Sequence, residues 1–175
     1  MSTEIPVLET ERLVLRGYMP SDFPAFAAMW ADPSVNRFIG GAPLSEEEAW
    51  AKFLRTLGMW VAMGFGFWTV VEKASGLCVG ETGFLEGRRE IVPTLKGTPE
   101  IGWAFVPSAQ GKGYATEAVS AALKWGDRRF GKVRMACIIA PENSASLRVA
   151  EKSGFREALR TTYKGDPTVM FFRDP

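Results

Sequence analysis

A glycine-rich segment in the second half of the chain carries the clearest chemical pattern. It joins a strand-like apolar run to a segment of helical periodicity and reads Gln110-Gly111-Lys112-Gly113-Tyr114-Ala115-Thr116. The first turn of a helix has free backbone N–H groups and the positive end of the helix dipole, and glycines allow a close approach of the chain to a phosphate oxygen. The segment therefore predicts a phosphate cradle.

The segment departs from two common phosphate-binding patterns. A P-loop places Gly-Lys-Ser/Thr four residues after a first Gly, and residues 111–113 end in Gly instead. The dinucleotide fingerprint requires a third Gly where Thr116 stands, an opening βαβ unit, and an acidic residue after the next strand, where the chain has Ala140. A glycine turn that binds nothing stays open as the structural alternative.

The composition limits the acids, bases and ligands. There is no His among the 175 residues, which excludes Ser-His-Asp catalysis, a His base and His metal ligands, and we expect no metal site. Cys78 and Cys137 are too far apart for a CxxC pair and too few for a four-ligand zinc site, so we expect buried, reduced thiols in a cytoplasmic protein. The net charge of +1 indicates neither a nucleic acid nor an anionic membrane as partner.

The length and the pattern along the chain favour one globular domain over residues 1–175. The hydrophobic content is 46%, and no linker, repeat or low-complexity run divides the chain. The segment Met1 to Leu8 has no basic region followed by an apolar run, and no window of about 18 residues is uninterruptedly apolar. We therefore expect neither secretion nor a membrane span.

Hydrophobic periodicity and turn residues predict the elements that position the glycine segment. The expected strands are 13–15, 67–72, 77–85, 100–106, 135–140, 155–162 and 168–172, and the expected helices are 22–31, 49–62, 114–130 and 144–152. Ser21 is the expected cap of the first helix, and a Ser-x-x-Glu capping box at 45–48 precedes the second. The second helix is expected to bury the apolar residues Trp50, Phe53, Leu54, Leu57 and Val61, and residues 87–98 are expected to form a surface loop.

Four segments, in order, resemble the GCN5-related N-acetyltransferase (GNAT) superfamily. They are Gln110 to Ala115, Glu100-Ile101-Gly102-Trp103, the pair Asn143 to Ser146 with Glu151 to Phe155, and the opening Thr10-Glu11-Arg12-Leu13-Val14-Leu15-Arg16. The opening is similar to the branch of the ribosomal-protein-alanine N-acetyltransferases, the RimJ/RimL-like branch. The resemblance implies an α/β (α+β) fold: a twisted, mixed, mostly antiparallel sheet of about seven strands, with a splayed parallel central pair, flanked by about four helices.

The resemblance also implies where acetyl-CoA binds as cosubstrate. Residues matching the family's pyrophosphate loop are Gln110, Gly111, Lys112, Gly113, Tyr114 and Ala115. Unpaired main-chain groups of Phe105 and Val106 are expected to bond the pantetheine arm, as if it were an added strand. Asn143 would bond the pantetheine and Ser146 would lie near the thioester; a plain helix cap is the alternative for Asn143.

Acetyl transfer requires a base for the amine proton and an acid for the leaving thiolate. Glu100, an acidic residue inside an apolar strand, is the first choice for the base, with a structural ion pair to an Arg as its alternative; Glu81 is the second. Many family members carry a Tyr acid where this chain has Ala150, and Ser146 is the expected substitute.

The leading hypothesis is direct transfer from acetyl-CoA to a primary amine at a protein or peptide N-terminus. Two alternatives stay open: acetylation of a small amine, such as a polyamine, amino acid or antibiotic, and a CoA-binding sensor without turnover. The absent Tyr favours the sensor. Dimers are common in the family, so a homodimer is one further expectation that the resemblance brings.

Overall fold

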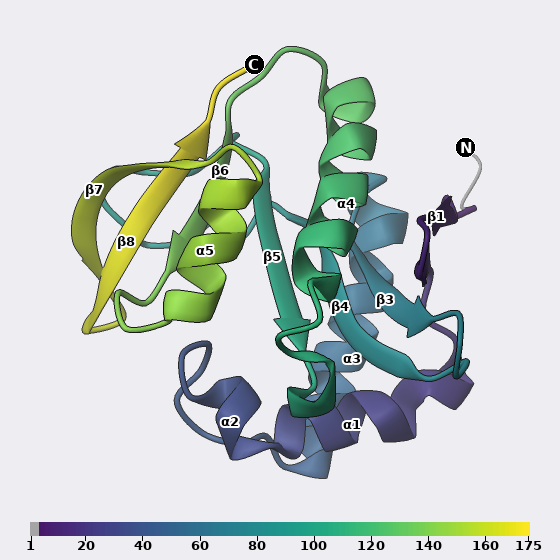
Figure 1. Cartoon of the computed structure of the whole chain (residues 1–175). Helices are drawn as coiled ribbons and strands as arrows, with labels where there is room; N and C mark the ends of the chain where they lie inside the picture. The colour runs from purple at the N-terminus through teal and green to yellow at the C-terminus, as the bar shows by residue number, and fades with distance from the viewer. Residues whose placement is uncertain (1–3) are drawn as a thin grey trace.

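The computed structural model describes residues 4–175 (Figure 1). Residues 1–3, which belong to the Met1 to Leu8 segment considered above, lie outside the described residues. Within the described part, no helix is both long and apolar enough to cross a membrane.

One mixed sheet of eight strands forms the centre of the fold, in the order β1-β2-β3-β4-β5-β6-β8-β7. The strands are β1 (Leu8–Glu9), β2 (Leu13–Arg16), β3 (Phe67–Glu72), β4 (Cys78–Leu85), β5 (Glu100–Phe105), β6 (Met135–Ile139), β7 (Arg156–Tyr163) and β8 (Asp166–Arg173). Only β5 and β6 run parallel among the paired strands of residues 4–175. The expected mixed sheet with a parallel central pair is confirmed, and the additional strand, β1, is too short to show a pattern in the sequence.

Helices cover both faces of the sheet. They are α1 (Phe23–Ala31), α2 (Pro33–Asn36), α3 (Glu46–Met63), α4 (Tyr114–Phe130) and α5 (Ser144–Lys152). In Figure 1, α4 and α5 lie in front of the sheet and α3 lies behind it. The core follows this division in part: Val119 of α4 belongs to the main apolar cluster, and Phe26 of α1 and Phe53 of α3 form a second cluster with Ala104. Trp60 of α3, however, joins the main cluster.

The first helix begins one residue later than predicted. Pro20–Asp22 form a 3-10 turn, and α1 begins at Phe23. The predicted cap, Ser21, is wrong: the Asp22 carboxylate accepts the N–H of Met19 at 2.8 Å and is held by Arg16 at 2.7 and 2.8 Å. This ion pair connects β2 to the turn that precedes the helix.

The capping box before α3 is confirmed, but part of its predicted buried face is wrong. The Ser45 hydroxyl accepts the N–H of Glu48, and the Glu48 carboxylate accepts the N–H of Ser45. Phe53 is fully buried, whereas Trp50 and Val61 are 44% and 74% exposed, and Leu54 is exposed as well. The buried stripe of α3 is narrower than predicted, and its members are Ala49, Phe53, Thr56 and Trp60.

The segment 87–98 is the predicted loop, but it is not wholly at the surface. Ile91 and Leu95 are buried against Met170 of β8. These two anchors hold the loop against the sheet and bring Arg89 to the beginning of β5. Of the two cysteines, Cys137 is buried as expected and Cys78 is only partly buried; both are free thiols.

Candidate active site

The glycine segment forms a tight turn between β5 and α4. Strand β5 ends at Phe105, a 3-10 turn follows at Pro107–Ala109, and α4 begins at Tyr114. Gly111 and Gly113 have φ angles of +75° and +81°. Residues with a Cβ rarely adopt this left-handed region, so the turn requires glycine at both positions.

The turn presents a row of free backbone donors. Among residues 4–175, the N–H groups of residues 111–116 have no acceptor, and the first N–H of α4 that is bonded within the chain is that of Glu117, to the Gly113 carbonyl at 3.1 Å. These donors lie at the positive end of the α4 dipole. Such a row is suited to an anion with several oxygens, such as a pyrophosphate, because each oxygen can accept more than one N–H.

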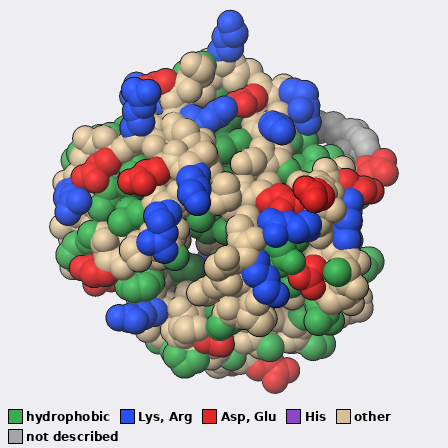
Figure 2. All heavy atoms as spheres, in the orientation of Figure 1, with side chains coloured by type: hydrophobic (Ala, Val, Ile, Leu, Met, Phe, Trp, Pro, Cys, Tyr) green, Lys and Arg blue, Asp and Glu red, His purple; other side chains and the backbone are tan. Residues whose placement is uncertain are grey.

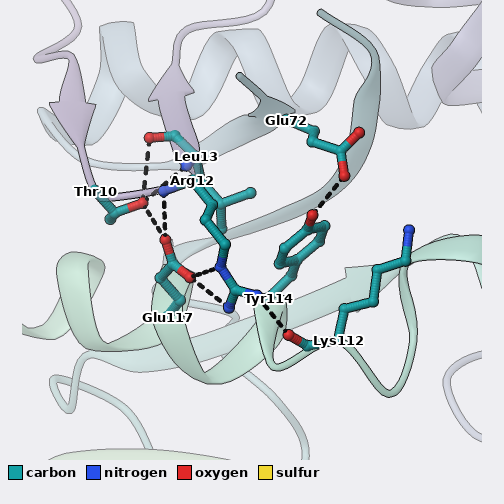
Figure 3. Close-up of polar contacts among 7 residues, drawn as sticks. All are labelled: Thr10, Arg12, Leu13, Glu72, Lys112, Tyr114 and Glu117. Carbon is teal, nitrogen blue, oxygen red and sulfur yellow. Dashed lines mark hydrogen bonds and ion pairs between the residues drawn. The ribbon is translucent and has the colours of Figure 1, made fainter. Parts of the chain in front are cut away.

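The side chains of the segment have other partners. Gln110 Nε2 donates to the Phe105 carbonyl at 3.2 Å, so this side chain braces the turn. The buried ring of Tyr114 is held by Glu72, whose carboxylate accepts the phenol O–H and raises the Tyr114 pKa. Lys112 is exposed, and in Figure 3 its side chain extends away from Glu117. Ala115 lies in the first turn of α4. The row of donors that this segment leaves free among the described residues is therefore that of its main chain.

The parallel strands β5 and β6 pair at one position only. Glu100 is opposite Ala136, where the Ala136 N–H bonds the Pro99 carbonyl at 2.9 Å, and no further residues of the two strands are in register. The strands separate toward the carboxyl end of β5, as the sequence resemblance implied. Beyond Ala136, the peptide groups that face this opening are available to an inserted ligand.

The register of β5 shows which peptide groups face the opening. The Val106 N–H donates to Val79 of the β4 side at 3.0 Å, and the Val106 carbonyl accepts the N–H of Ala109. Since alternate residues of an antiparallel pair point their N–H and C=O groups to opposite sides, Phe105 and Trp103 face the opening. Phe105 thus faces the opening as expected, although its carbonyl already accepts Gln110 Nε2 at 3.2 Å. Both main-chain groups of Val106 are engaged elsewhere, and Trp103 was missed. Only the register could have identified Trp103.

The beginning of α5 lines the other side of the opening. Asn143 caps the helix, with Oδ1 accepting the Ser146 N–H at 3.2 Å, so the helix-cap alternative is correct for this oxygen. Its Nδ2 has no protein partner among the described residues and is available to a ligand carbonyl. Ser146 Oγ accepts the Trp103 indole N–H at 3.3 Å, which leaves the serine O–H free to donate. Ala150, one turn on, is fully buried.

Glu100 is held in an ion pair at the closed end of the opening. Arg89 donates to both of its carboxylate oxygens through Nε and Nη2, at 2.7 to 3.0 Å. The Glu100 side chain is 5% exposed. From the sequence, Glu100 could be a catalytic base or part of a structural ion pair. Its geometry is that of the ion pair.

Glu81 on β4 is the second buried carboxylate of the region, and it lies farther toward the open end. It is opposite Ala104 in the β4–β5 register. Tyr18 donates its O–H to Oε2 at 2.7 Å, while Oε1 has no hydrogen-bond partner among residues 4–175. Burial raises the Glu81 pKa, and the positive charge of Lys52 on α3 and the Tyr18 hydroxyl oppose this rise in part. A buried carboxylate with a free oxygen can take up a proton.

Figure 2 shows that the surface is hollowed near the centre of this face. In the same orientation in Figure 1, the hollow lies between α5 and β5, which is the side where β5 and β6 separate. Lys and Arg side chains lie around the hollow, so its surroundings favour a negatively charged ligand.

Two parallel strands that separate beside a row of free N–H groups at a helix N-terminus are suited to a long ligand that carries phosphate groups. Residues 12–156 match the family model described as an acetyltransferase (GNAT) domain. The chain belongs to the GNAT family and is an acyltransferase, with acetyl-CoA as its cosubstrate.

Individual proteins are similar to this chain over nearly its whole length. The chain is 33% identical over 177 residues to the uncharacterized protein YkkB of Bacillus subtilis (strain 168). This alignment covers 95% of this chain and 94% of YkkB. A solved structure from Bordetella pertussis, assigned to the GnaT acetyltransferase family, is 35% identical, covers 96% of this chain and 99% of its own, and has a TM-score of 0.84.

A more distant structure shares the fold. It is RimL, a ribosomal L7/L12 alpha-N-protein acetyltransferase, in complex with coenzyme A. It is 18% identical, covers 97% of this chain and 98% of its own, and has a TM-score of 0.76.

Proposed function

We propose that the protein transfers an acetyl group from acetyl-CoA directly to the primary amine of a protein or peptide N-terminus. The observation that carries the proposal is the row of free N–H groups at residues 111–116 beside the unpaired stretch of β5. The row suits the pyrophosphate, and the Phe105 and Trp103 peptide groups suit the pantetheine amides, which would bond them as a strand does.

The acceptor class is supported by the shape of the site. The hollow between α5 and β5 opens directly on the surface in Figure 2, which suits the end of a chain that is itself part of a large molecule. RimL, which shares the fold, is named for action on a protein α-amino group. Its identity is low, so the opening at the surface is the stronger support.

We propose Glu81 rather than Glu100 as the group that accepts the amine proton. Both oxygens of Glu100 are engaged by Arg89, whereas Glu81 Oε1 is free. A carboxylate whose pKa is raised by burial is a better base near neutral pH than an exposed one.

We propose that Ser146, on the other side of β5, donates a proton to the leaving thiolate. Ala104, opposite Glu81, belongs to the α1 and α3 cluster, and its neighbour Trp103 packs on the α4 side and bonds Ser146. Glu81 and Ser146 therefore lie on opposite faces of β5, beside the consecutive residues Ala104 and Trp103. With acetyl-CoA supplying the activated acyl group, the amine would enter on the Glu81 side and the thiol would leave on the Ser146 side.

Titration calorimetry with acetyl-CoA, followed by mass spectrometry with a panel of peptides and small amines, tests this function. We expect binding and the mass gain of one acetyl group at the N-terminus of a peptide. Acetylation confined to polyamines, amino acids or antibiotics would contradict the acceptor proposed. Binding without any product would favour the CoA sensor, and the absence of binding would contradict the cofactor site.

A further inference from the structure

The beginning of the chain contacts the glycine turn from a distance of 100 residues in sequence (Figure 3). Arg12, which precedes β2, donates from Nη1 to the Lys112 carbonyl at 2.9 Å. Lys112 lies between the two glycines with positive φ, at the centre of the predicted cradle. The contact therefore connects the N-terminal segment to the part of the turn that presents free N–H groups.

The Arg12 guanidinium is itself held firmly by α4. Nε and Nη2 each lie 2.7 Å from Oε2 of Glu117, and the Arg12 backbone N–H donates to Oε1 at 2.9 Å. Thr10 donates its hydroxyl to the same Oε1 at 2.6 Å. The guanidinium also lies over the Tyr114 ring, 4.6 Å from its centre. Contacts from several directions leave it little freedom to swing away from the turn.

The bond to the Lys112 carbonyl also orients a donor of the cradle. A peptide unit is planar, and in the trans form its C=O and N–H point in opposite directions. Because the Lys112 carbonyl and the Gly113 N–H belong to one peptide unit, a carbonyl turned toward Arg12 turns the Gly113 N–H away from it. Gly113 lies directly against the Arg12 guanidinium, since a Cβ added at Gly113 would be 3.4 Å from Arg12 Nη2.

We propose that Arg12 is a positioning residue for the coenzyme A pyrophosphate, acting through the Lys112 carbonyl and not through the reacting atoms. The proposal rests on acetyl-CoA as the cosubstrate. Arg12, anchored by Glu117, keeps the free N–H groups of the turn in the arrangement that binds the pyrophosphate. Without it, the glycine turn has several other accessible conformations, and ordering the turn on binding reduces the affinity.

The experiment compares Arg12→Met with Arg134→Met. Arg134 makes a similar exposed ion pair, with Asp174 at 2.6 Å, so the second variant controls for the loss of a surface ion pair. Kd is measured by calorimetry for coenzyme A and by competition for pantetheine, which lacks the pyrophosphate. For R12M we expect the Kd of coenzyme A to rise about tenfold, the effect of one lost charge-assisted hydrogen bond, with no change for pantetheine. R134M should change neither.

Kinetics separate positioning from a general structural role. With an acceptor amine at saturation, R12M should raise KM for acetyl-CoA about tenfold with little change in kcat, and kcat/KM for S-acetylpantetheine should stay the same. Equal losses with both donors, or no change in coenzyme A affinity, would overturn the proposal. If the wild-type protein transfers no acetyl group, the proposed function fails, but the calorimetric comparison still tests Arg12.

Two further variants keep the test decisive if R12M folds poorly. Arg12→Lys keeps the positive charge but cannot bond Glu117 and the Lys112 carbonyl together, so we expect most of the loss of affinity to persist. Full affinity in R12K would show that charge alone matters and would overturn the positioning role. Glu117→Gln keeps the shape but weakens the anchor, and we expect a smaller loss, again confined to ligands with the pyrophosphate.

Discussion

The two ends of the β5–β6 opening use the same two strands in opposite ways. At the closed end, Ala136 bonds Pro99, and Glu100 is neutralised by Arg89. At the open end, Trp103 and Phe105 have no partner in β6, and the N–H groups of the turn beyond them have no acceptor among residues 4–175. Buried polar groups are normally paired within a protein. Pairing at the closed end stabilises the fold, and we propose that its absence at the open end leaves room for coenzyme A.

The two buried carboxylates follow the same division. Glu100 lies at the closed end, and both of its oxygens are bonded to a cation. Glu81 is nearer the open end and has one phenol donor and one free oxygen. We propose that Glu100 stabilises the fold and that Glu81 takes part in proton transfer, and the variants below test both roles.

The largest expected effect is on the rate in Glu81→Gln. Removal of the proton acceptor should lower kcat about 100- to 10,000-fold with little change in KM for acetyl-CoA, because a positioned base contributes about that factor. Steady-state rates with a peptide acceptor measure this. A rate in E81Q equal to that of the wild type would remove Glu81 from the mechanism.

Glu100→Gln should lower stability and leave kcat unchanged. The variant leaves Arg89 without its carboxylate, and breaking a buried ion pair costs about 3–5 kcal/mol. Arg89 is partly exposed, so we expect the lower end of this range in the free energy of unfolding, measured with urea. kcat of the folded fraction should be retained; a stable E100Q protein that has lost its kcat would reverse the comparison.

Gly113→Val tests the open end directly. At a φ of +81° a β-branched residue is strained by about 1–3 kcal/mol, so the turn should relax and the Kd of coenzyme A should rise about 5- to 100-fold. Gly76→Val is the matched control, since Gly76 has a φ of +71° in the β3–β4 turn and open space around its Cα. G76V should be destabilised similarly yet bind coenzyme A normally; equal affinity in the two variants would remove the turn from the site.

The smallest effect expected is a pH dependence of stability. Burial raises the Glu81 pKa above the ordinary glutamate value. At a pH between these two values, Glu81 is protonated in the native protein and ionised in the unfolded chain. The free energy of unfolding should therefore fall as the pH rises through that window, by about 1.4 kcal/mol for each unit of pKa difference. Urea unfolding at several pH values should show this slope in the wild type and not in E81Q. The same slope in both proteins would assign it to another group.

Local features were predictable because a few neighbouring residues determine them. The glycine turn before α4, the capping box before α3 and the limits of α5 all follow from backbone preferences within about five residues. The family resemblance then correctly implied the separated parallel strands. The sequence predicted burial less well, since Trp50 and Val61 lie on the apolar side of a helical pattern but outside the stripe of α3 that is buried.

What the sequence by itself determined is the glycine turn: glycines at two positions that require positive φ, followed by a helix whose first N–H groups have no partner among residues 4–175. Only the tertiary structure decided which carboxylate is neutralised and what holds the turn. Arg89 comes to Glu100 from a loop anchored in the core, and Arg12 comes to Lys112 from the other end of the chain. Such contacts depend on strand register and on the packing of distant segments, which no local pattern of residues encodes.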